Sequence, residues 1–267
     1  MSSLSFNLHA VGLLAPGLSS LSEFRTVCKE QKKINITEPL LLPAPAVLPS
    51  NERRRSSRPV RLTLACIEQL VLQGYPVLSD LRSIFATDDG VGEINQQMFE
   101  VLATTRQISP LVFPNSVHSA VAGYFSIAYQ NQKPATHVSR GVESFVAGLL
   151  CAVTDAIIFS EPVLFVCFDP AMTDPMSEVL PITQPTASAW LISAGEPTDP
   201  VVARFTLKLE SDNFSGSPLP AWVPQEWAHN STAYGYAALG LIEQPPDAFY
   251  RLQYGAQTLR LEVTQRE

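Results

Sequence analysis

Serine, cysteine and histidine side chains could support nucleophilic catalysis in this chain, but they do not form a recognisable arrangement. The candidate nucleophiles are Ser139, Ser144 and Cys151, and the candidate bases are His118 and His137. Such a nucleophile needs a base beside it, and a third group, commonly a carboxylate, must orient that base. The sequence has no GxSxG motif and no serine or cysteine placed beside a histidine that a carboxylate orients. An acyl transferase or hydrolase with a non-cysteine or displaced nucleophile is therefore the alternative, not the leading hypothesis.

The remaining motifs predict no metal and no cofactor. The four cysteines (Cys28, Cys66, Cys151 and Cys167) lie far apart without CxxC spacing, and the histidines lack ligand spacing. Gly90-Val91-Gly92 is followed by Asn95 where a dinucleotide-binding loop has its third glycine. The adjacent Asp88 and Asp89 point to opposite sides of an extended chain, so they indicate a turn rather than a catalytic pair.

Composition indicates a folded chain with a partner surface. Of 267 residues, 46% are apolar and only 16% are charged, whereas an average domain has about 25% charged residues. The net charge of −7 argues against nucleic-acid binding, because no positive field attracts phosphate.

No membrane segment is expected. The first basic side chain is Arg25, so the N-terminus lacks the basic region of a secretory signal. Residues 107–132 contain no Lys, Arg, Asp or Glu, but polar residues and prolines interrupt the stretch. The sequence therefore predicts a soluble, cytoplasmic protein with reduced thiols.

Periodicity predicts an α/β protein in which strands alternate with helices. Such alternation favours a layered domain, and we expect a central helix covered by two sheets. Ser57 and Pro59 suit the first turn of a helix that continues through residue 72. Residues 116–130 suggest a helix buried on nearly all sides, and Ala147 and Gly148 would let the 141–159 helix approach its neighbours closely. The predicted strands are 5–13, 81–86, 136–139, 163–168, 186–193 and 201–210; the predicted helices are 62–72, 93–103, 116–130, 141–159 and 232–242, followed by a hairpin at 249–264.

Five segments, in order, resemble a known family. They are LPSNERRR from Leu48, VRLTLA from Val60, FATDDG from Phe85, SPLVFPNSVHSAVAGYFSIA from Ser109 and SFVAGLL from Ser144. In this order they resemble the beta-ketoacyl synthase-like N-terminal domain family, whose members are similar to the first half of thiolase-fold ketosynthases and occur beside aryl polyene biosynthesis enzymes. The resemblance implies a thiolase-like layered α-β-α-β-α fold, mainly its N-terminal half, over residues 1–195. Residues 196–267 would then be a shortened, irregular C-terminal part packed on the same globule.

The resemblance also implies that the catalytic positions are vacant. Ketosynthases carry a nucleophilic cysteine at the N-terminus of the buried central helix, where the helix dipole and amide groups stabilise negative charge. That position falls at or near Gly141, which cannot be acylated. The two catalytic histidines of ketosynthases come from the second half of the fold, and here only His229 follows residue 137. We therefore expect no catalytic residue and a role like that of a chain length factor, which pairs with a catalytic ketosynthase and shapes its acyl tunnel.

The family resemblance further suggests where partners bind. The strand before the central helix pairs antiparallel across the subunit interface in thiolase-fold dimers, and an unpaired edge strand would be an aggregation hazard. In this chain that strand is Ala135, Thr136, His137, Val138 and Ser139.

The candidates for tunnel or interface contact are Ser116, His118, Ser119, Tyr124 and Phe125, with core packing as the alternative for the two aromatic residues. A basic cluster of Arg53, Arg54, Arg55 and Arg58 is a possible contact for an acyl carrier protein, with a solvated helix entrance or an ion-pair site as the alternative. A homodimeric scaffold is a further possibility, because the same strand would serve either kind of dimer.

Overall fold

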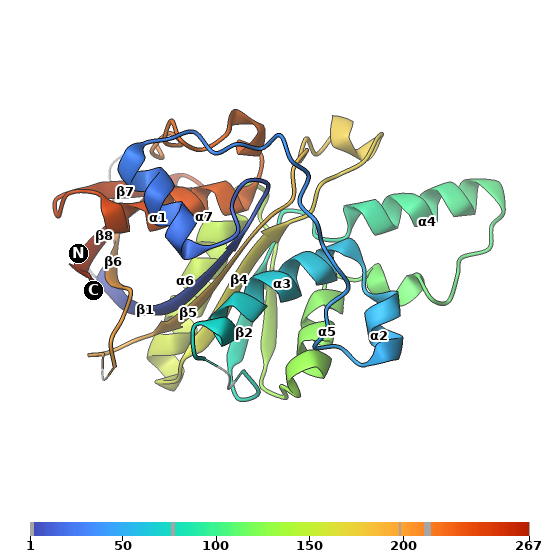
Figure 1. The fold of residues 1–267 in the computed structure, drawn as a ribbon, viewed down its shortest axis with the longest axis horizontal. Helices are drawn as coiled ribbons and strands as arrows, with labels where there is room; N and C mark the ends of the chain where they lie inside the picture. Colours follow the sequence, from blue (N-terminus) through green and yellow to red (C-terminus); the bar gives the residue numbers. More distant parts are fainter. Residues whose placement is uncertain (1–2, 76–77, 198, 211–214, 267) are drawn as a thin grey trace.

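A computed structural model describes residues 3–75, 78–197, 199–210 and 215–266, and these contain one eight-stranded sheet (Figure 1). Its strand order is β3-β2-β4-β5-β1-β6-β8-β7. The strands β2, β3 and β4 run parallel to one another, and the remaining pairs are antiparallel. The strands are β1 (Ser3–Leu14), β2 (Arg82–Ala86), β3 (Ala135–Val138), β4 (Val163–Asp169), β5 (Thr186–Ser193), β6 (Ala203–Glu210), β7 (Phe249–Tyr254) and β8 (Gln257–Arg266).

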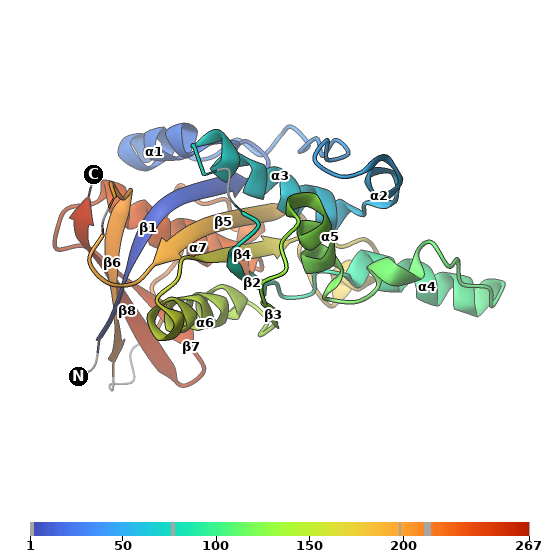
Figure 2. The same ribbon diagram turned by 90° about the horizontal axis from the view of Figure 1, so that it is seen from below.

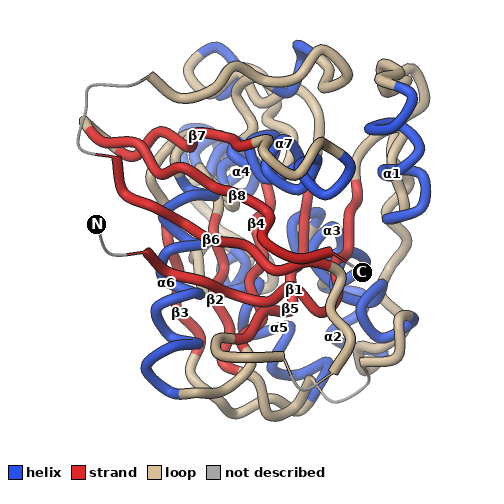
Figure 3. The backbone as a smooth tube through the Cα atoms, turned by 90° about the vertical axis from the view of Figure 1, so that its left-hand side faces the viewer, coloured by secondary structure: helices blue, strands red, loops and turns tan. Residues whose placement is uncertain are grey.

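Helices cover both faces of the sheet. Figures 2 and 3 show the strands between α3 and α5 on one side and α6 on the other. The helix α7 packs against α6 and β4. The helices are α1 (Leu21–Glu30), α2 (Ser50–Arg55), α3 (Arg58–Leu72), α4 (Gly92–Thr104), α5 (Ala120–Tyr129), α6 (Ser144–Phe159) and α7 (Ser231–Leu239), with short 3-10 turns η1 (Phe113–Asn115), η2 (Met176–Glu178), η3 (Gln225–Trp227) and η4 (Gly240–Glu243).

The central strand β4 is apolar almost throughout because both of its faces are covered. Val163, Phe165 and Cys167 belong to the core on the α6 and α7 side. Leu164 and Val166 alternate with them and belong to the core on the α3 side. Side chains of a strand point to opposite faces in turn, so a strand between two helix layers has no polar face.

The α/β class predicted from the sequence is confirmed. In place of two separate sheets around the central helix, the described residues form one continuous sheet, whose strands β4 and β7 both contact α6. The last strands, β6, β8 and β7, continue the sheet that β1 to β5 begin. Consequently residues after 195 are not a separate layer: β6 pairs with β1, and α7 contacts α6.

Two glutamines of α3 complete the hydrogen bonding of β1. Beyond Leu8, β1 pairs with β5 on one side only. On its other side, Gln69 accepts from the amide of Leu13 (3.0 Å) and donates to the carbonyl of Leu13 (2.8 Å). Gln73 makes the same pair of bonds to Val11, at 3.4 and 2.8 Å. The i,i+4 spacing puts both amides on one helix face, so α3 substitutes for a neighbouring strand.

The helix α3 begins as the sequence predicts. Ser57 is its N-cap residue and a proline lies in its first turn. The Ser57 hydroxyl makes no capping hydrogen bond, so the proline and the apolar face of the helix, rather than a cap, define the start.

The helix α6 is a core helix. Residues 141–159 are long and apolar enough to cross a membrane by length and composition, with a mean hydropathy of 1.9. However, nine of the sixteen residues of α6 are buried between the sheet and α7. A Cβ added at Gly148 would lie 2.6 Å from the ring of Phe165 and 2.7 Å from Ala86. The predicted close approach at Gly148 is therefore confirmed, and α6 is packed as a core helix of this chain.

The helix α5 differs from its prediction. It begins at Ala120, after η1, and only one face is buried, by residues including Tyr124 and Phe125. Ile127 is 46% exposed on the other face. The expectation of burial on nearly all sides is therefore wrong within this chain.

Candidate functional site

A strand-turn-helix connection stands where the resemblance places the lost nucleophile. The strand β3 ends at Val138 and α6 begins at Ser144. Between them, Gly141 has a φ of +58°, in the left-handed region that side chains disfavour. The Ser144 hydroxyl accepts from the amide of Arg140 (2.8 Å) and donates to the carbonyl of Gly141 (2.7 Å). The turn is thus held in shape by a buried serine.

The turn has room for a side chain but supplies none. A Cβ built at Gly141 has Oδ1 of Asp88 as its nearest neighbour, at 4.0 Å. Both neighbouring positions, Arg140 and Val142, also lack a thiol or hydroxyl. The three positions 140–142, where the resemblance places the nucleophile, therefore carry no thiol or hydroxyl.

Carboxylates gather at the same end of the sheet. Asp88 and Asp89 follow β2, and Asp169 ends β4. Burial raises the pKa of Asp88, and the charges of Asp169 and Asp89 raise it further. The carboxylate of Asp88 thus lies beside Gly141, and the adjacent Arg140 is paired with Glu143; an electropositive setting, by contrast, activates a cysteine.

Asp169 joins three elements through a fully buried carboxylate. It accepts hydrogen bonds from the amide (2.8 Å) and hydroxyl (2.7 Å) of Thr232, from the Ser231 hydroxyl (3.1 Å) and from the amide of Asp88 (3.2 Å). Burial raises its pKa, and these bonds partly oppose that increase. Sequence reasoning missed this residue, although an aspartate that ends a wholly apolar strand and precedes Pro170 is a signal for a buried polar contact.

The nucleophile and base pairs of the alternative hypothesis do not form. Ser139 donates to the carbonyl of Asp88 (2.6 Å), and Ser144 is occupied in the turn. Cys151 is half-buried inside α6, where desolvation and then Asp155 raise its pKa. The His137 ring stacks on Phe85 with ring centroids 5.5 Å apart, and its Nε2 has no hydrogen-bond partner within the described residues.

One serine does contact a histidine, in a place that sequence reasoning missed. Nε2 of His9 lies 2.8 Å from the Ser193 hydroxyl, between β1 and β5. His9 stands at the register shift between Leu8 and Ala10, and Asn7 also donates to Ser193 (3.3 Å). These contacts satisfy polar groups at an irregularity of the sheet.

The strand β3 lies at one edge of the sheet. Ala135 and Thr136 are exposed, His137 and Val138 are half-buried, and Ser139 is exposed just beyond the strand. The carbonyls of Pro134 and Val138 accept from amides of the β2 side. Ala135 and His137, the alternate residues, therefore direct their amides and carbonyls to the open edge. This edge has no neighbouring strand among the described residues.

The predicted tunnel contacts divide into two groups. Tyr124 and Phe125 are buried in the core on the α3 side, where the Phe125 ring lies 5.8 Å from that of Phe85. His118 and Ser119 are exposed and Ser116 is half-buried, in the segment before α5. Within this chain the two aromatic residues pack as core, and only the polar three reach the surface.

Arginines of the predicted basic cluster already form contacts within this chain. Arg53 donates to the carbonyls of Ala46 (2.7 Å) and Leu48 (2.9 Å), which anchors the loop before α2. Arg58 pairs with Glu93 at 3.2 Å. Arg54, Arg55 and Arg58 are all exposed, and of these three Arg58 is held by the ion pair to Glu93.

The comparisons with known proteins agree with this geometry. The family model described as "Beta-ketoacyl synthase, N-terminal domain" matches residues 27–230. No curated protein sequence matches significantly. Among solved structures, the ketosynthase ApeO in complex with its chain length factor ApeC from Xenorhabdus doucetiae matches with a TM-score of 0.73 and 23% identity, over 97% of this chain and 99% of that chain.

Two further structures show the same fold at lower similarity. The ishigamide ketosynthase/chain length factor matches with a TM-score of 0.60 and 12% identity, over 77% of this chain and 67% of that chain. A beta-ketoacyl synthase from Burkholderia phymatum STM815 matches with a TM-score of 0.59 and 12% identity, over 79% and 65% of the two chains. The thiolase-like ketosynthase fold implied by the resemblance is thereby confirmed. Because the family model spans most of the residues, this chain belongs to the beta-ketoacyl synthase N-terminal domain family.

Proposed function

We propose that the chain is a non-catalytic subunit, similar to a chain length factor, that pairs with a beta-ketoacyl synthase and shapes its acyl tunnel in an aryl polyene or related polyketide-like pathway. The observation that carries the proposal is Gly141, which occupies the turn at the start of the central helix without a nucleophile. Acyl transfer by a condensing enzyme requires that nucleophile. The acidic side chains beside the turn further disfavour thiolate chemistry there.

The free edge of β3 supports pairing with another subunit. Apolar side chains are exposed at the end of α6, near where β3 begins: Ile157 (41%), Ile158 (66%) and Phe159 (44%). Arg82 of β2 shows that these two places are close together. Its side chain stacks on the ring of Phe159 in α6, and the next residue, Ser83, pairs with Ala135 at the start of β3. An open strand edge flanked by apolar groups is typical of a surface that a partner covers.

The solved relatives support the kind of partner. One matched structure is a ketosynthase in complex with its chain length factor, and this chain covers 99% of the matched chain. Another contains a type II polyketide synthase acyl carrier protein with its ketosynthase. By analogy, a ketosynthase would be the direct partner, and a carrier protein would visit mainly through it, with Arg54 and Arg55 as the outward-facing contacts. Location in the cytoplasm stays a prediction.

Co-expression tests the proposal. The untagged chain is produced with a tagged ketosynthase encoded in the same gene neighbourhood, and the complex is isolated through the tag. We expect equimolar co-purification, and no turnover of acyl thioesters by this chain alone. A stable monomer that hydrolyses or transfers an acyl group by itself would contradict the proposal and would direct mutagenesis to Ser139, Ser144 and Cys151.

A further inference from the structure

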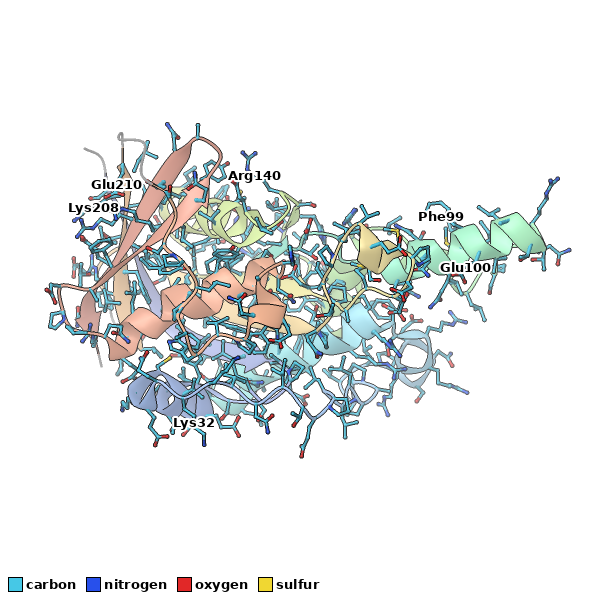
Figure 4. The ribbon with its side chains drawn as sticks, turned by 90° about the horizontal axis from the view of Figure 1, so that it is seen from above. Lys32, Phe99, Glu100, Arg140, Lys208 and Glu210 are labelled. Carbon is cyan, nitrogen blue, oxygen red and sulfur yellow. The ribbon has the colours of Figure 1, made fainter. Side chains whose placement is uncertain are left out.

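The helix α4 stands clear of the rest of the molecule. Figures 1 and 4 show it projecting from the body, with Phe99 and Glu100 on the projecting part. Only its first turns are attached: Gly92, Ile94 and Gln96 are its buried residues. The Gln96 amide donates to the carbonyl of Asp174, and its oxygen accepts from Thr173 (3.0 Å). We call α4 and the segment that returns from it, residues 92–119, the arm.

The arm exposes large apolar side chains along its length. The exposed fractions are 63% for Phe99, 41% for Leu102, 58% for Leu111, 57% for Phe113 and 46% for Val117. The only charged residues of the arm are Glu93, Glu100 and Arg106. An isolated helix of this length is marginal in water, and a surface rich in apolar and poor in charged groups is typical of the core of an interface.

The base of the arm adjoins the C-terminal end of β3, the strand that has the free edge. The amide of Thr87, in the loop that leads into α4, donates to the carbonyl of Val138 (3.1 Å). Ser139 donates to the carbonyl of Asp88 in the same loop (2.6 Å). At the other end of the arm, His118 is close enough to His137 of β3 to help lower its pKa, after burial. A subunit paired with β3 would therefore also lie beside the arm.

The arm projects from the body of the molecule, so a partner that covers its apolar side chains must receive them in an apolar groove. The hollows of the described surface lie between α1 and α3, between α6 and β7, at the start of α3, and around η4 with β7 or β8. None of them is lined by a residue of β3. The hollow at the start of α3 adjoins the arm through Glu93, so the test below separates binding of a ketosynthase from binding of a second copy.

We propose that the arm is an anchor that inserts its apolar side chains, Phe99 foremost, into a groove of the ketosynthase subunit that pairs with β3. This inference rests on the proposed function and adds to it a second point of attachment. A buried aromatic anchor surrounded by weaker contacts is the usual source of affinity in an interface.

The test measures the affinity of the tagged ketosynthase for this chain and for two variants. Phe99→Asp places a charge on the arm, and Leu72→Asp places the same charge at the end of α3, where Leu72 is 82% exposed. We expect Phe99→Asp to weaken binding by at least about tenfold, as for a moderate hot spot, and Leu72→Asp to leave it within about twofold. Both positions are exposed, so the thermal unfolding midpoints of the two variants should agree.

A second measurement does not depend on a variant. Hydrogen exchange of the wild-type chain should slow in the second half of α4 when the ketosynthase is added. Equal binding by both variants, with no slowing in α4, overturns the arm proposal and leaves the proposed function standing. Failure of the wild-type chain to bind refutes the proposed function itself. If the wild-type chain associates with itself and Phe99→Asp does not, the arm binds a second copy of this chain, and the proposal is overturned.

Discussion

At the scale of single residues, Gly141 is the position on which the proposed non-catalytic role depends. Its left-handed backbone resembles the constrained turn that presents a nucleophile, yet it carries no side chain. Asp88 is the nearest side chain to a Cβ built there, and the adjacent Arg140 is paired with Glu143 at 2.8 Å. Under the proposed function, this turn keeps the backbone of a nucleophile-bearing turn without the nucleophile.

Restoring a thiol should not restore a reactive one. In Gly141→Cys, the Asp88 carboxylate would lie about 4 Å from the new side chain, and two charges at that distance repel by about 4 kcal/mol at an effective dielectric constant of 20. The helix N-terminus favours a thiolate by only about 1 kcal/mol. We expect the new cysteine to be alkylated by iodoacetamide at pH 7 more slowly than a free thiol, with mass spectrometry to locate the label. Rapid, selective labelling at residue 141 would show that the site is still able to activate a cysteine.

Asp169 should be a major contributor to stability. Asp169→Ala leaves donors from Thr232, Ser231 and Asp88 without an acceptor in a buried site, and one unsatisfied buried group costs about 1–3 kcal/mol. We expect a loss of at least about 2 kcal/mol in the free energy of unfolding, measured in urea. Asp247→Asn, at an exposed carboxyl, is the control. Equal stability of Asp169→Ala and this control would mean that the network is not formed.

The pH dependence of that contribution has a definite sign. Because the folded-state pKa of Asp169 is raised, the folded state binds this proton more tightly than the unfolded state. The stabilisation is complete below the ordinary aspartate pKa of about 3.9 and is lost as the pH rises through the folded value. Wild-type stability relative to Asp169→Asn should therefore fall from pH 3.5 upward. A relative stability that rises with pH would contradict the raised pKa.

At the scale of elements, the pair of glutamines on α3 takes the place of a strand beside β1. Gln69→Ala would leave the amide and carbonyl of Leu13 without their partner, so we expect a loss of about 2 kcal/mol. Glu68→Ala, on the exposed face of the same helix, should change stability by less than about 0.5 kcal/mol. Urea unfolding of the two variants measures the difference. A similar effect of both substitutions would assign the loss to the helix rather than to β1.

The open edge of β3 can be blocked without disturbing its pairing with β2. Ala135→Pro removes an amide that points outward and leaves the alternate residues bonded to β2. We expect binding to the ketosynthase to weaken by at least about tenfold, while Ala135→Ser binds as the wild type does. Unchanged binding of the proline variant would show that β3 is not the strand that pairs.

Much of the element order was predictable from local pattern. The strand at 186–193 was predicted with the boundaries that the structure shows. A short run of mostly apolar residues is typical of a strand that is buried in a sheet. The position of Gly141 before the central helix came from the family resemblance. Single-sheet topology was not predictable, because strand order depends on pairings between distant segments. The exposure of Phe99 and Leu102 was not predictable from the sequence. Apolar residues at helical spacing indicate a helix face that is buried, but they do not show whether it is buried in the chain's own core or against a partner.

At the scale of the whole molecule, one side is built like an interface. Of the sixteen large apolar side chains exposed in the described residues, eight belong to the arm and the end of α6, the two elements beside the free edge of β3. A permanent heterodimer typically buries more than about 2,000 Å². We expect the chain to be poorly soluble or self-associated when produced alone and soluble as an equimolar complex, which size-exclusion chromatography with light scattering measures. A well-behaved monomer at high concentration would argue against permanent burial of this side.

The most direct test of the central claim is a condensation assay with malonyl-loaded carrier protein. The ketosynthase is assayed alone, with this chain, and with Ala135→Pro, and the products are identified by mass spectrometry. The account predicts that activity, or a defined product length, appears only when the wild-type chain is present, and that this chain alone is inert. Full activity and unchanged product length of the ketosynthase without this chain, or turnover of an acyl thioester by this chain alone, would contradict it.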